Sequence, residues 1–162
     1  MTKIYTKTGD RGTTGTFYGR ISKDAQLAKA LGAIDELNSW IGVCRHQTSL
    51  DQELQKIQKN LLTIGSSLSG SGLKISASET RNLEKLIDKL TRELPKLSNF
   101  IFPEGFLQIA RSVARRAERE VVATKIKDKN ILKYLNRLSD ALFIMGRWVN
   151  FQMGIEEEVW KN

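Results

Sequence analysis

Residues 54–68 read LQKIQKNLLTIGSSL and carry the clearest fold signal in the chain. Their apolar side chains follow a nearly heptad spacing, at Leu54, Ile57, Leu61, Ile64 and Leu68. This spacing places the apolar side chains on one helical face, as in the seam of a helical bundle. It predicts a helix from about Leu50 to Ser69, which the glycine-containing segment 70–72 ends.

The same periodicity recurs through the rest of the chain, and strand-like alternation is almost absent. It predicts a first helix from near Asp24, a third opening at Ser76, a fourth over Leu107–Lys125 and a fifth from Lys129 to Gln152. Ser76–Glu79 matches a capping box, and Pro95 ends the third helix. The predicted fold is all-α, an up-and-down five-helix bundle in a single domain over residues 1–162.

Residues 1–22 are polar and rich in glycine, and we expect an extended arm with a short strand at Lys3–Thr6. Within the arm, Thr6–Thr14 combines glycines and threonines with the cations Lys7 and Arg11. Backbone N–H groups in glycine-rich turns, together with cations, suit phosphate oxygens. An ordinary polar loop with a turn at 9–10 explains the same composition, so both interpretations stay open. It is not a Walker A loop, because no Gly-Lys-Ser/Thr closes it.

The charge balance favours an anionic partner. The chain has 162 residues, with 26 Lys and Arg against 18 Asp and Glu, a formal net charge of +8. A nucleotide, a polyphosphate or an acidic surface would suit that charge. Nucleic acid remains open, but no zinc-finger, RNP-type or basic-zipper pattern is present, and the interpretation that we favour has no nucleic-acid partner.

The single cysteine and the single histidine offer little catalytic chemistry. Cys44 falls on the apolar stripe of the first predicted helix, and we expect a buried, inert thiol. His46 has no second His or Cys for a zinc site, so we expect a surface or cap residue and no protein-built metal site. No signal peptide or long apolar span is present, and we expect a cytoplasmic protein with no membrane partner.

The last two predicted helices carry polar groups beside their apolar faces. Arg111 and Arg115, with either Glu118 or Arg119, fall on one helical face and would clamp a triphosphate; solvated or paired arginines are the alternative. Asn136 lies beside core positions and needs a partner. The acidic run at 156–158 is interpreted as solvated, and Trp148 and Trp160 as packing residues.

Three stretches, taken in order, resemble the trimeric type of ATP:cob(I)alamin adenosyltransferase. They are Tyr5–Thr14, Gly32–Ser39, and the pair Ala110–Arg119 with Tyr134–Asp140. The resemblance runs nearly end to end and includes Gly154–Trp160. It implies a homotrimeric five-helix bundle with active sites between subunits. It also implies transfer of the 5′-deoxyadenosyl group of ATP to the Co(I) centre of a corrinoid, giving adenosylcobalamin and triphosphate.

The resemblance also implies roles for particular residues. The arm and the residue before the first helix would bind ATP through Thr6, Lys7, Thr8, Gly9, Thr14, Gly15 and Lys23. From the helices, the resemblance adds Arg115, Arg116, Ala117, Glu118, Arg119 and Asn136 to the nucleotide site. Asp35 would pair with Arg111 across the subunit interface and act with Arg115 as the catalytic group. Phe100 would lie over the corrin and displace its lower ligand. Mg²⁺ would be held mostly by phosphate oxygens.

Cob(I)alamin is itself the nucleophile in this reaction, which fits a sequence with no convincing Ser, Cys or His nucleophile. One departure concerns Pro103–Ala110, which is several residues shorter than usual in the family and lacks its Leu-His ending. Phe102 and Phe106 are therefore alternatives to Phe100, while packing of the whole aromatic loop onto the bundle is the simplest interpretation.

Two other functions remain open at this stage. One is a non-catalytic carrier or sensor of ATP or adenosylcobalamin on the same fold, and the other is a basic bundle that binds nucleic acid. An electron-donor reductase and an adenosylcobalamin-dependent acceptor enzyme are the protein partners that the resemblance implies.

Overall fold

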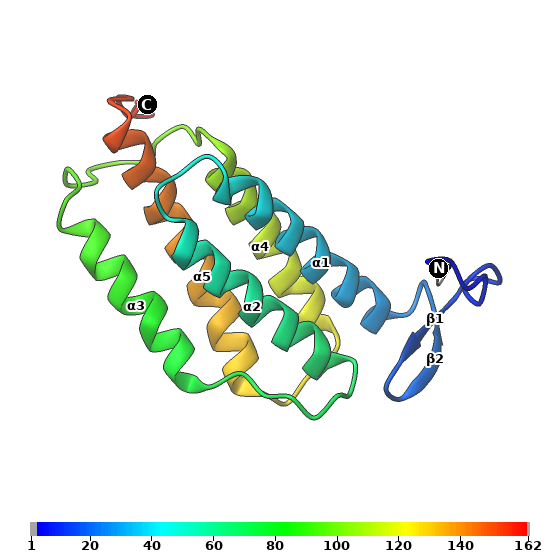
Figure 1. The fold of residues 1–162 in the computed structure, drawn as a ribbon. Coiled ribbons are helices and arrows are strands. Elements are labelled where there is room, and N and C mark those ends of the chain that lie inside the picture. The colour runs from blue at the N-terminus through cyan, green and yellow to red at the C-terminus, as the bar shows by residue number, and fades with distance from the viewer. Residues whose placement is uncertain (1–2, 162) are drawn as a thin grey trace.

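The computed structural model describes residues 3–161, and in that range it forms five helices and one hairpin (Figure 1). In chain order these are β1 (Thr13–Thr16), β2 (Gly19–Ser22), α1 (Gln26–Arg45), α2 (Asp51–Leu68), α3 (Ala77–Thr91), α4 (Phe106–Ala123) and α5 (Lys129–Gln152). Successive helices run in opposite directions, and the hairpin lies beside the N-terminal end of α1 (Figure 1). The predicted up-and-down bundle is confirmed.

The core lies between the helices where the periodicity placed it. The closest packing joins α1 to α2 and α4, and joins α5 to α3 and α4. The heptad residues of α2 are all buried, and Leu54, Leu61 and Ile64 have no exposed surface. Burying each such side chain contributes roughly 1.5–3 kcal/mol, which makes this seam a main source of stability. Within residues 3–161, no helix is long and apolar enough to cross a membrane.

Helix ends depart from prediction by a few residues. Ser76 caps α3, and its hydroxyl accepts from the N–H of Ser78 at 3.2 Å. The reciprocal half of the predicted capping box is absent, because the Glu79 carboxylate accepts from Asn60 Nδ2 at 3.0 Å instead. The third helix ends at Thr91, before the predicted stop at Pro95.

The predicted strand at Lys3–Thr6 is wrong, since those residues form no strand. The strands lie later in the arm, in a hairpin that pairs Thr13 with Ser22 and Thr16 with Gly19. The hydroxyl of Thr16 donates to the Gly19 carbonyl at 2.8 Å and closes the turn. Gly19 has a φ of +111°, a conformation that favours glycine, so the turn needs this residue.

The C-terminal tail is not simply solvated. Ile101 and Val159 form an isolated antiparallel bridge, and the N–H of Trp160 donates to the Phe100 carbonyl at 2.8 Å. The interpretation of the acidic run as solvated is wrong for Glu157, which forms an ion pair with a buried arginine. The tail therefore covers part of the aromatic loop that precedes α4.

Candidate functional site

The loop before β1 holds a backbone conformation that side chains rarely adopt. Lys7 has a φ of +59°, which is uncommon outside glycine. Two turns shape the loop, from Asp10 N to the Lys7 carbonyl at 3.3 Å and from Gly12 N to the Gly9 carbonyl at 3.2 Å. Within residues 3–161 the N–H groups of Thr8 and Gly9 donate to no other residue. Free N–H groups beside a left-handed residue are typical of an anion-binding nest.

Arg20 of β2 holds this loop against the hairpin. Its Nη2 donates to the Thr8 carbonyl at 2.6 Å and to the Thr13 carbonyl at 3.0 Å, and its Nε donates to the Thr13 hydroxyl at 3.0 Å. The hydroxyls of Thr6 and Thr8 lie 2.9 Å apart. The loop is therefore tied to a rigid hairpin by its carbonyl groups, while Lys7 stays exposed.

Lys23 follows β2 and returns to the same loop. Its N–H donates to the Gly12 carbonyl at 2.9 Å. Its Nζ lies 3.4 Å from the position that a Cβ on Gly9 would take. Glycine at this position thus lets the ammonium group approach the loop backbone. Thr14 and Gly15 lie in β1, so the structure brings the predicted ATP residues of the arm into one loop-and-hairpin unit.

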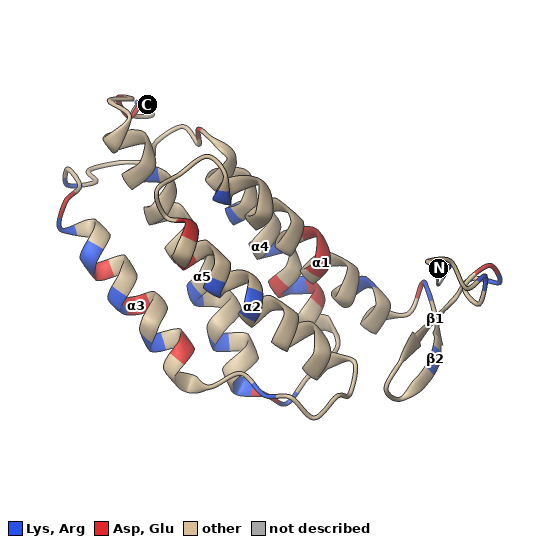
Figure 2. Ribbon diagram, viewed as in Figure 1, with Lys and Arg blue, Asp and Glu red and all other residues tan. Residues whose placement is uncertain are grey.

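One face of α4 carries two arginines that have no partner in the part of the chain that the structure describes. Arg115 and Arg119 are exposed and form no ion pair or hydrogen bond with any side chain in residues 3–161. Arg116, between them in sequence, forms an ion pair with Glu36 of α1. Figure 2 shows acidic and basic residues adjoining where α1 and α4 run side by side. The pairing leaves Arg115 and Arg119 available to an anion.

The remaining predicted residues of α4 and α5 have different surroundings. The half-buried Glu118 carboxylate accepts from Asn136 Nδ2 at 3.1 Å, which provides the partner that this asparagine requires. Ala117 is fully buried in the core, so its methyl group does not lie on the exposed face with the free arginines. Among the described residues, no three His, Cys, Asp or Glu side chains gather as a metal site.

The hairpin tip is anchored to the end of α2. The N–H of Phe17 donates to the Ser69 carbonyl at 2.9 Å. The ring of Tyr18 lies against Gly70, where an added Cβ would come within 2.7 Å of the ring. Gly70 also has a φ of +98°. Both the conformation and the contact therefore require glycine here. The Phe17 hydrogen bond and the Tyr18 contact fix the hairpin on the bundle.

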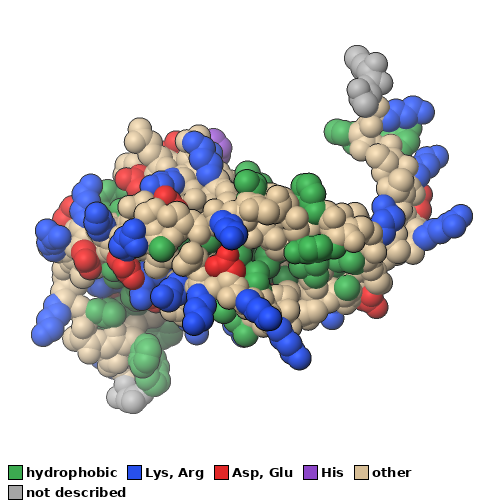
Figure 3. Space-filling model, turned by 90° about the horizontal axis from the view of Figure 1, so that it is seen from below, with side chains coloured by type: hydrophobic (Ala, Val, Ile, Leu, Met, Phe, Trp, Pro, Cys, Tyr) green, Lys and Arg blue, Asp and Glu red, His purple; other side chains and the backbone are tan. Residues whose placement is uncertain are grey.

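A contact at the start of α1, just after the arm, joins it to the end of the arginine run. Gln26 Nε2, three residues after Lys23, donates to the Glu120 carbonyl at 2.9 Å and to its carboxylate at 2.7 Å. Glu120 directly follows Arg119. Figure 3 shows the arm projecting from the bundle with Lys and Arg side chains along it. The arm and the part of α4 that carries Arg119 thus lie at the same end of α1.

A groove of about 600 Å³ lies between the aromatic loop, α4 and α5, and both Arg111 and Phe100 line it. Phe100 is 75% exposed, and its ring meets that of Trp160 edge to face at 6.4 Å. Burial lowers the pKa of Arg111, and the nearby charge of Arg115 lowers it further. The groove therefore joins a partly desolvated cation to an exposed aromatic ring.

Asp35 and Arg111 are not paired within the chain. Asp35 is exposed on α1, and its carboxylate forms no ion pair within residues 3–161. The Nε of Arg111 donates to Gln108 Oε1 at 2.8 Å. The predicted pairing of Asp35 with Arg111 across an interface stays a prediction, because it involves a second chain.

Of the two other phenylalanines of the loop, Phe106 packs against the bundle and Phe102 is exposed. Phe106 stacks on Trp40 of α1, with ring centroids 6.4 Å apart and planes at 28°. This contact agrees with the interpretation that the loop packs onto the bundle. Phe102 is 51% exposed. Its N–H donates to the Glu158 carbonyl at 3.0 Å, so the tail holds the loop backbone while the ring remains accessible.

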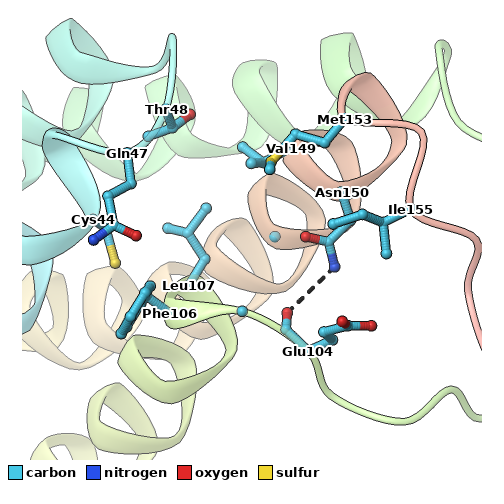
Figure 4. Close-up of a pocket in the computed structure, with 12 residues that line it drawn as sticks. Cys44, Gln47, Thr48, Glu104, Phe106, Leu107, Val149, Asn150, Met153 and Ile155 are labelled. Carbon is cyan, nitrogen blue, oxygen red and sulfur yellow. Dashed lines mark hydrogen bonds between the residues drawn. The ribbon is translucent and has the colours of Figure 1, made fainter.

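A separate cavity of about 370 Å³ lies between the C-terminal ends of α1 and α5 and the start of α4 (Figure 4). Cys44, Phe106, Leu107 and Val149 give it mostly apolar walls. Burial raises the pKa of the Cys44 thiol to about 11. The thiol is therefore neutral near pH 7. The predicted burial of Cys44 is confirmed, while its inertness stays a prediction.

Sequence reasoning missed several residues that shape the site. Arg20 fixes the loop, Glu36 occupies Arg116, Tyr18 anchors the hairpin, and Gln108 holds Arg111. The missing Leu-His ending of the loop was noted, but Gln108, which follows Leu107, was not identified. The other three depend on contacts between distant segments that periodicity does not encode.

Comparison with known proteins places this architecture in a family. The sequence profile described as cobalamin adenosyltransferase matches residues 4–149. The corrinoid adenosyltransferase of Bacillus subtilis (strain 168) is 41% identical, covering 94% of this chain and 89% of that protein. The corrinoid adenosyltransferase MMAB of Bos taurus is 42% identical, covering 98% of this chain and 76% of that protein.

Solved structures agree with the sequence matches. One is a phenylalanine-to-alanine variant of the PduO-type ATP:corrinoid adenosyltransferase from Lactobacillus reuteri, complexed with cobalamin and ATP. It superimposes with a TM-score of 0.92 at 31% identity and covers 99% of this chain and 100% of its own. An arginine-to-lysine variant of the enzyme from the same organism, complexed with ATP, also gives a TM-score of 0.92. The chain therefore belongs to the cobalamin adenosyltransferase family.

Proposed function

We propose that this chain transfers the 5′-deoxyadenosyl group of ATP to the Co(I) centre of a corrinoid and releases triphosphate. The observation that carries this proposal is the groove that Arg111 and Phe100 share. A two-substrate transfer needs the nucleotide site and the aromatic surface for the corrinoid to lie close together. The groove runs along α4, the helix that also carries Arg115 and Arg119, which have no partner among residues 3–161, and this supports the proposal.

The arm and α4 would bind the nucleotide. The N–H groups of Thr8 and Gly9, with the ammonium groups of Lys7 and Lys23, suit the triphosphate oxygens. Arg115 and Arg119 would neutralise the charge that develops on the leaving triphosphate. Such preorganised donors typically contribute a factor of about 10²–10³ each to the rate.

Mg²⁺ fits this site only as a partner of the phosphates. No cluster of three acidic, His or Cys side chains forms among residues 3–161. The chemistry that Mg²⁺ would supply is charge neutralisation on the triphosphate, with phosphate oxygens and water as most of its ligands. Glu118, held by Asn136, is the acidic side chain available to a metal-bound water.

The corrinoid substrate would lie against the aromatic loop. Its Co(I) centre is the nucleophile that attacks the 5′ carbon of ATP, so the protein has to position the two substrates and exclude water. Phe100 is the most exposed phenylalanine of the chain's described part and lines the groove. An apolar ring there would remove the lower corrin ligand, which makes Co(II) easier to reduce.

Completion of the site requires a second copy. Asp35 is an exposed carboxylate, and the terminal nitrogens of Arg111 have no partner within residues 3–161. Pairing between copies would satisfy both groups and place each active site between subunits of a homotrimer. An electron-donor reductase and an acceptor enzyme that uses adenosylcobalamin are the protein partners that this reaction requires.

The test is an anaerobic assay with chemically generated cob(I)alamin, Mg²⁺ and ATP. We expect light-sensitive adenosylcobalamin and triphosphate to form at equal rates. Tight ATP binding without a cobalt–carbon bond would instead favour the carrier or sensor function. Steeply salt-dependent binding of DNA or RNA, insensitive to replacement of Thr8, would favour the nucleic-acid alternative.

A further inference from the structure

Gln108 is a buried polar residue in the first turn of α4, with only 5% of its surface exposed. Both ends of its side-chain amide have partners. The Nε2 group donates to the Phe143 carbonyl of α5 at 3.3 Å, and Oε1 accepts from Arg111 Nε at 2.8 Å. A buried amide with both ends engaged holds one orientation, because any rotation leaves a polar group unpaired.

Gly146 of α5 makes room for this side chain. A Cβ added at this position would lie 2.8 Å from Gln108 Nε2 and 3.3 Å from its Cδ, closer than ordinary packing allows. Gly146 sits within a helix and has an ordinary helical φ, so backbone conformation does not require glycine there. The Gln108 amide is the nearest group to that Cβ, with Leu107 Cβ next at 3.4 Å, so a side chain here requires the amide to move.

The hydrogen bond from Arg111 determines how its guanidinium group meets other molecules. Gln108 occupies the Nε, while Nη1 and Nη2 have no partner within residues 3–161. Arg111 also lines the groove that contains Phe100. A guanidinium fixed at Nε presents its two terminal nitrogens together, an arrangement suited to the two oxygens of a carboxylate.

We propose that Gln108 is a positioning residue for Arg111, and that Gly146 is the space it requires. Gln108 holds the guanidinium at Nε so that both Nη groups reach one carboxylate end-on. In the proposed function, on which this inference rests, that carboxylate is Asp35 of a second copy. Gln108 itself contacts no substrate and acts only through the orientation of Arg111.

The first experiment replaces the side chain without removing its bulk. Gln108→Leu keeps the volume close but removes the acceptor for Arg111 and the donor for Phe143. In ¹⁵N-arginine-labelled protein, we expect the Nε–H signal of Arg111 to lose its protection from solvent exchange; Arg111→Lys assigns that signal. We expect kcat/KM to fall roughly tenfold to a hundredfold, the usual effect of losing a hydrogen bond to a charged group.

Gly146→Ala tests the same arrangement without touching Gln108 or Arg111. Alanine favours helix more than glycine, so helix propensity itself gives no reason for a loss of stability. The added methyl group displaces the Gln108 amide, and we expect the same loss of Nε–H protection and a fall in kcat/KM in the same direction. If both variants lose Nε–H protection and activity, the effect comes from the position of the Gln108 amide and not merely from its removal.

Two controls separate positioning from destabilisation. Val121→Ala creates a cavity in the same helix, at a core position with no exposed surface. It should lower the melting temperature while keeping the Nε–H signal and kcat/KM. Gln55→Leu makes the same chemical change at an exposed position of α2 and should alter neither. All variants are compared at a protein concentration where light scattering gives each of them the same mass as the wild type.

The inference is overturned if Gln108→Leu keeps the protected Nε–H signal, or keeps kcat/KM within about twofold of wild type. It is also overturned if Val121→Ala loses as much activity at equal stability. A different result would contradict the proposed function: wild-type protein that forms no adenosylcobalamin. In that case the exchange measurement still decides whether Gln108 orients Arg111.

Discussion

Arg147 donates two hydrogen bonds to the carboxylate of Glu157, from Nε at 2.5 Å and from Nη2 at 2.9 Å. The Arg147 side chain is 3% exposed, and its Nη2 also donates to the Pro95 carbonyl at 3.0 Å. Its Cζ lies 6.0 Å from the centre of the Phe143 ring. One buried guanidinium thus ties α5 to the loop after α3 and to the C-terminal tail.

Removing the partner of this buried charge should be costly. We expect Glu157→Ala to reduce the free energy of unfolding by about 3 kcal/mol, because an unpaired buried charge remains. Urea denaturation measures this change. Glu156→Ala removes the neighbouring, exposed carboxylate and should stay within about 0.5 kcal/mol of wild type. Equal effects of the two replacements would show that the pair contributes nothing specific.

The bundle was predictable because its signal is local. Heptad spacing in α2 identified five core residues, and all five are buried. The hairpin was missed, and a single strand was expected at Lys3–Thr6 instead. Short strands depend on cross-strand pairing, here Thr14 with Ile21, which propensity along the chain does not reveal. Glu157 was misjudged for a related reason, since its partner lies on a helix face that periodicity assigns to the core.

The candidate site was predictable only as a set of residue types. The composition of the arm and of α4 indicated anion-binding chemistry. It did not distinguish Arg115, which has no partner among the described residues, from Arg116, which pairs with Glu36 in a helix distant in sequence. Nor did it indicate that Gln108 would hold Arg111. Such contacts follow from the register between helices, which is a tertiary property.

Arg115 should be essential for turnover and dispensable for folding. It is exposed and makes no ion pair within residues 3–161, so its removal costs little stability. We expect Arg115→Ala to lower kcat/KM for ATP by about 10²–10³, the range for losing one transition-state donor. Steady-state kinetics and light scattering give activity and mass. Arg81→Ala, an exposed arginine of α3, should behave as wild type; normal turnover in Arg115→Ala would contradict the proposed role.

Gly70 and Gly72 allow a matched test of how the hairpin is anchored. Both have positive φ, at +98° and +78°, but only Gly70 contacts the Tyr18 ring. Alanine at either position introduces backbone strain of about 1 kcal/mol. Only Gly70→Ala also displaces the hairpin, and we expect it to weaken ATP binding roughly fivefold, equivalent to about 1 kcal/mol. Calorimetric titration measures this; equal ATP affinity in both variants would mean that the anchor does not position the arm.

The buried thiol of Cys44 should make the protein less stable in alkali. Burial raises its pKa from 9.0 to about 11, so the unfolded chain loses the thiol proton at lower pH than the folded chain does. Stability from this group is complete below pH 9 and is lost as pH rises toward 11. By linkage, the wild type should lose up to about 2 kcal/mol more than Cys44→Ala between pH 8 and 10.5. Lysine and tyrosine titration affects both proteins alike and cancels in the comparison.

Parallel curves of unfolding free energy against pH would contradict this prediction. They would mean that the folded thiol ionises as readily as the unfolded one, and that it is open to solvent rather than enclosed beside the cavity.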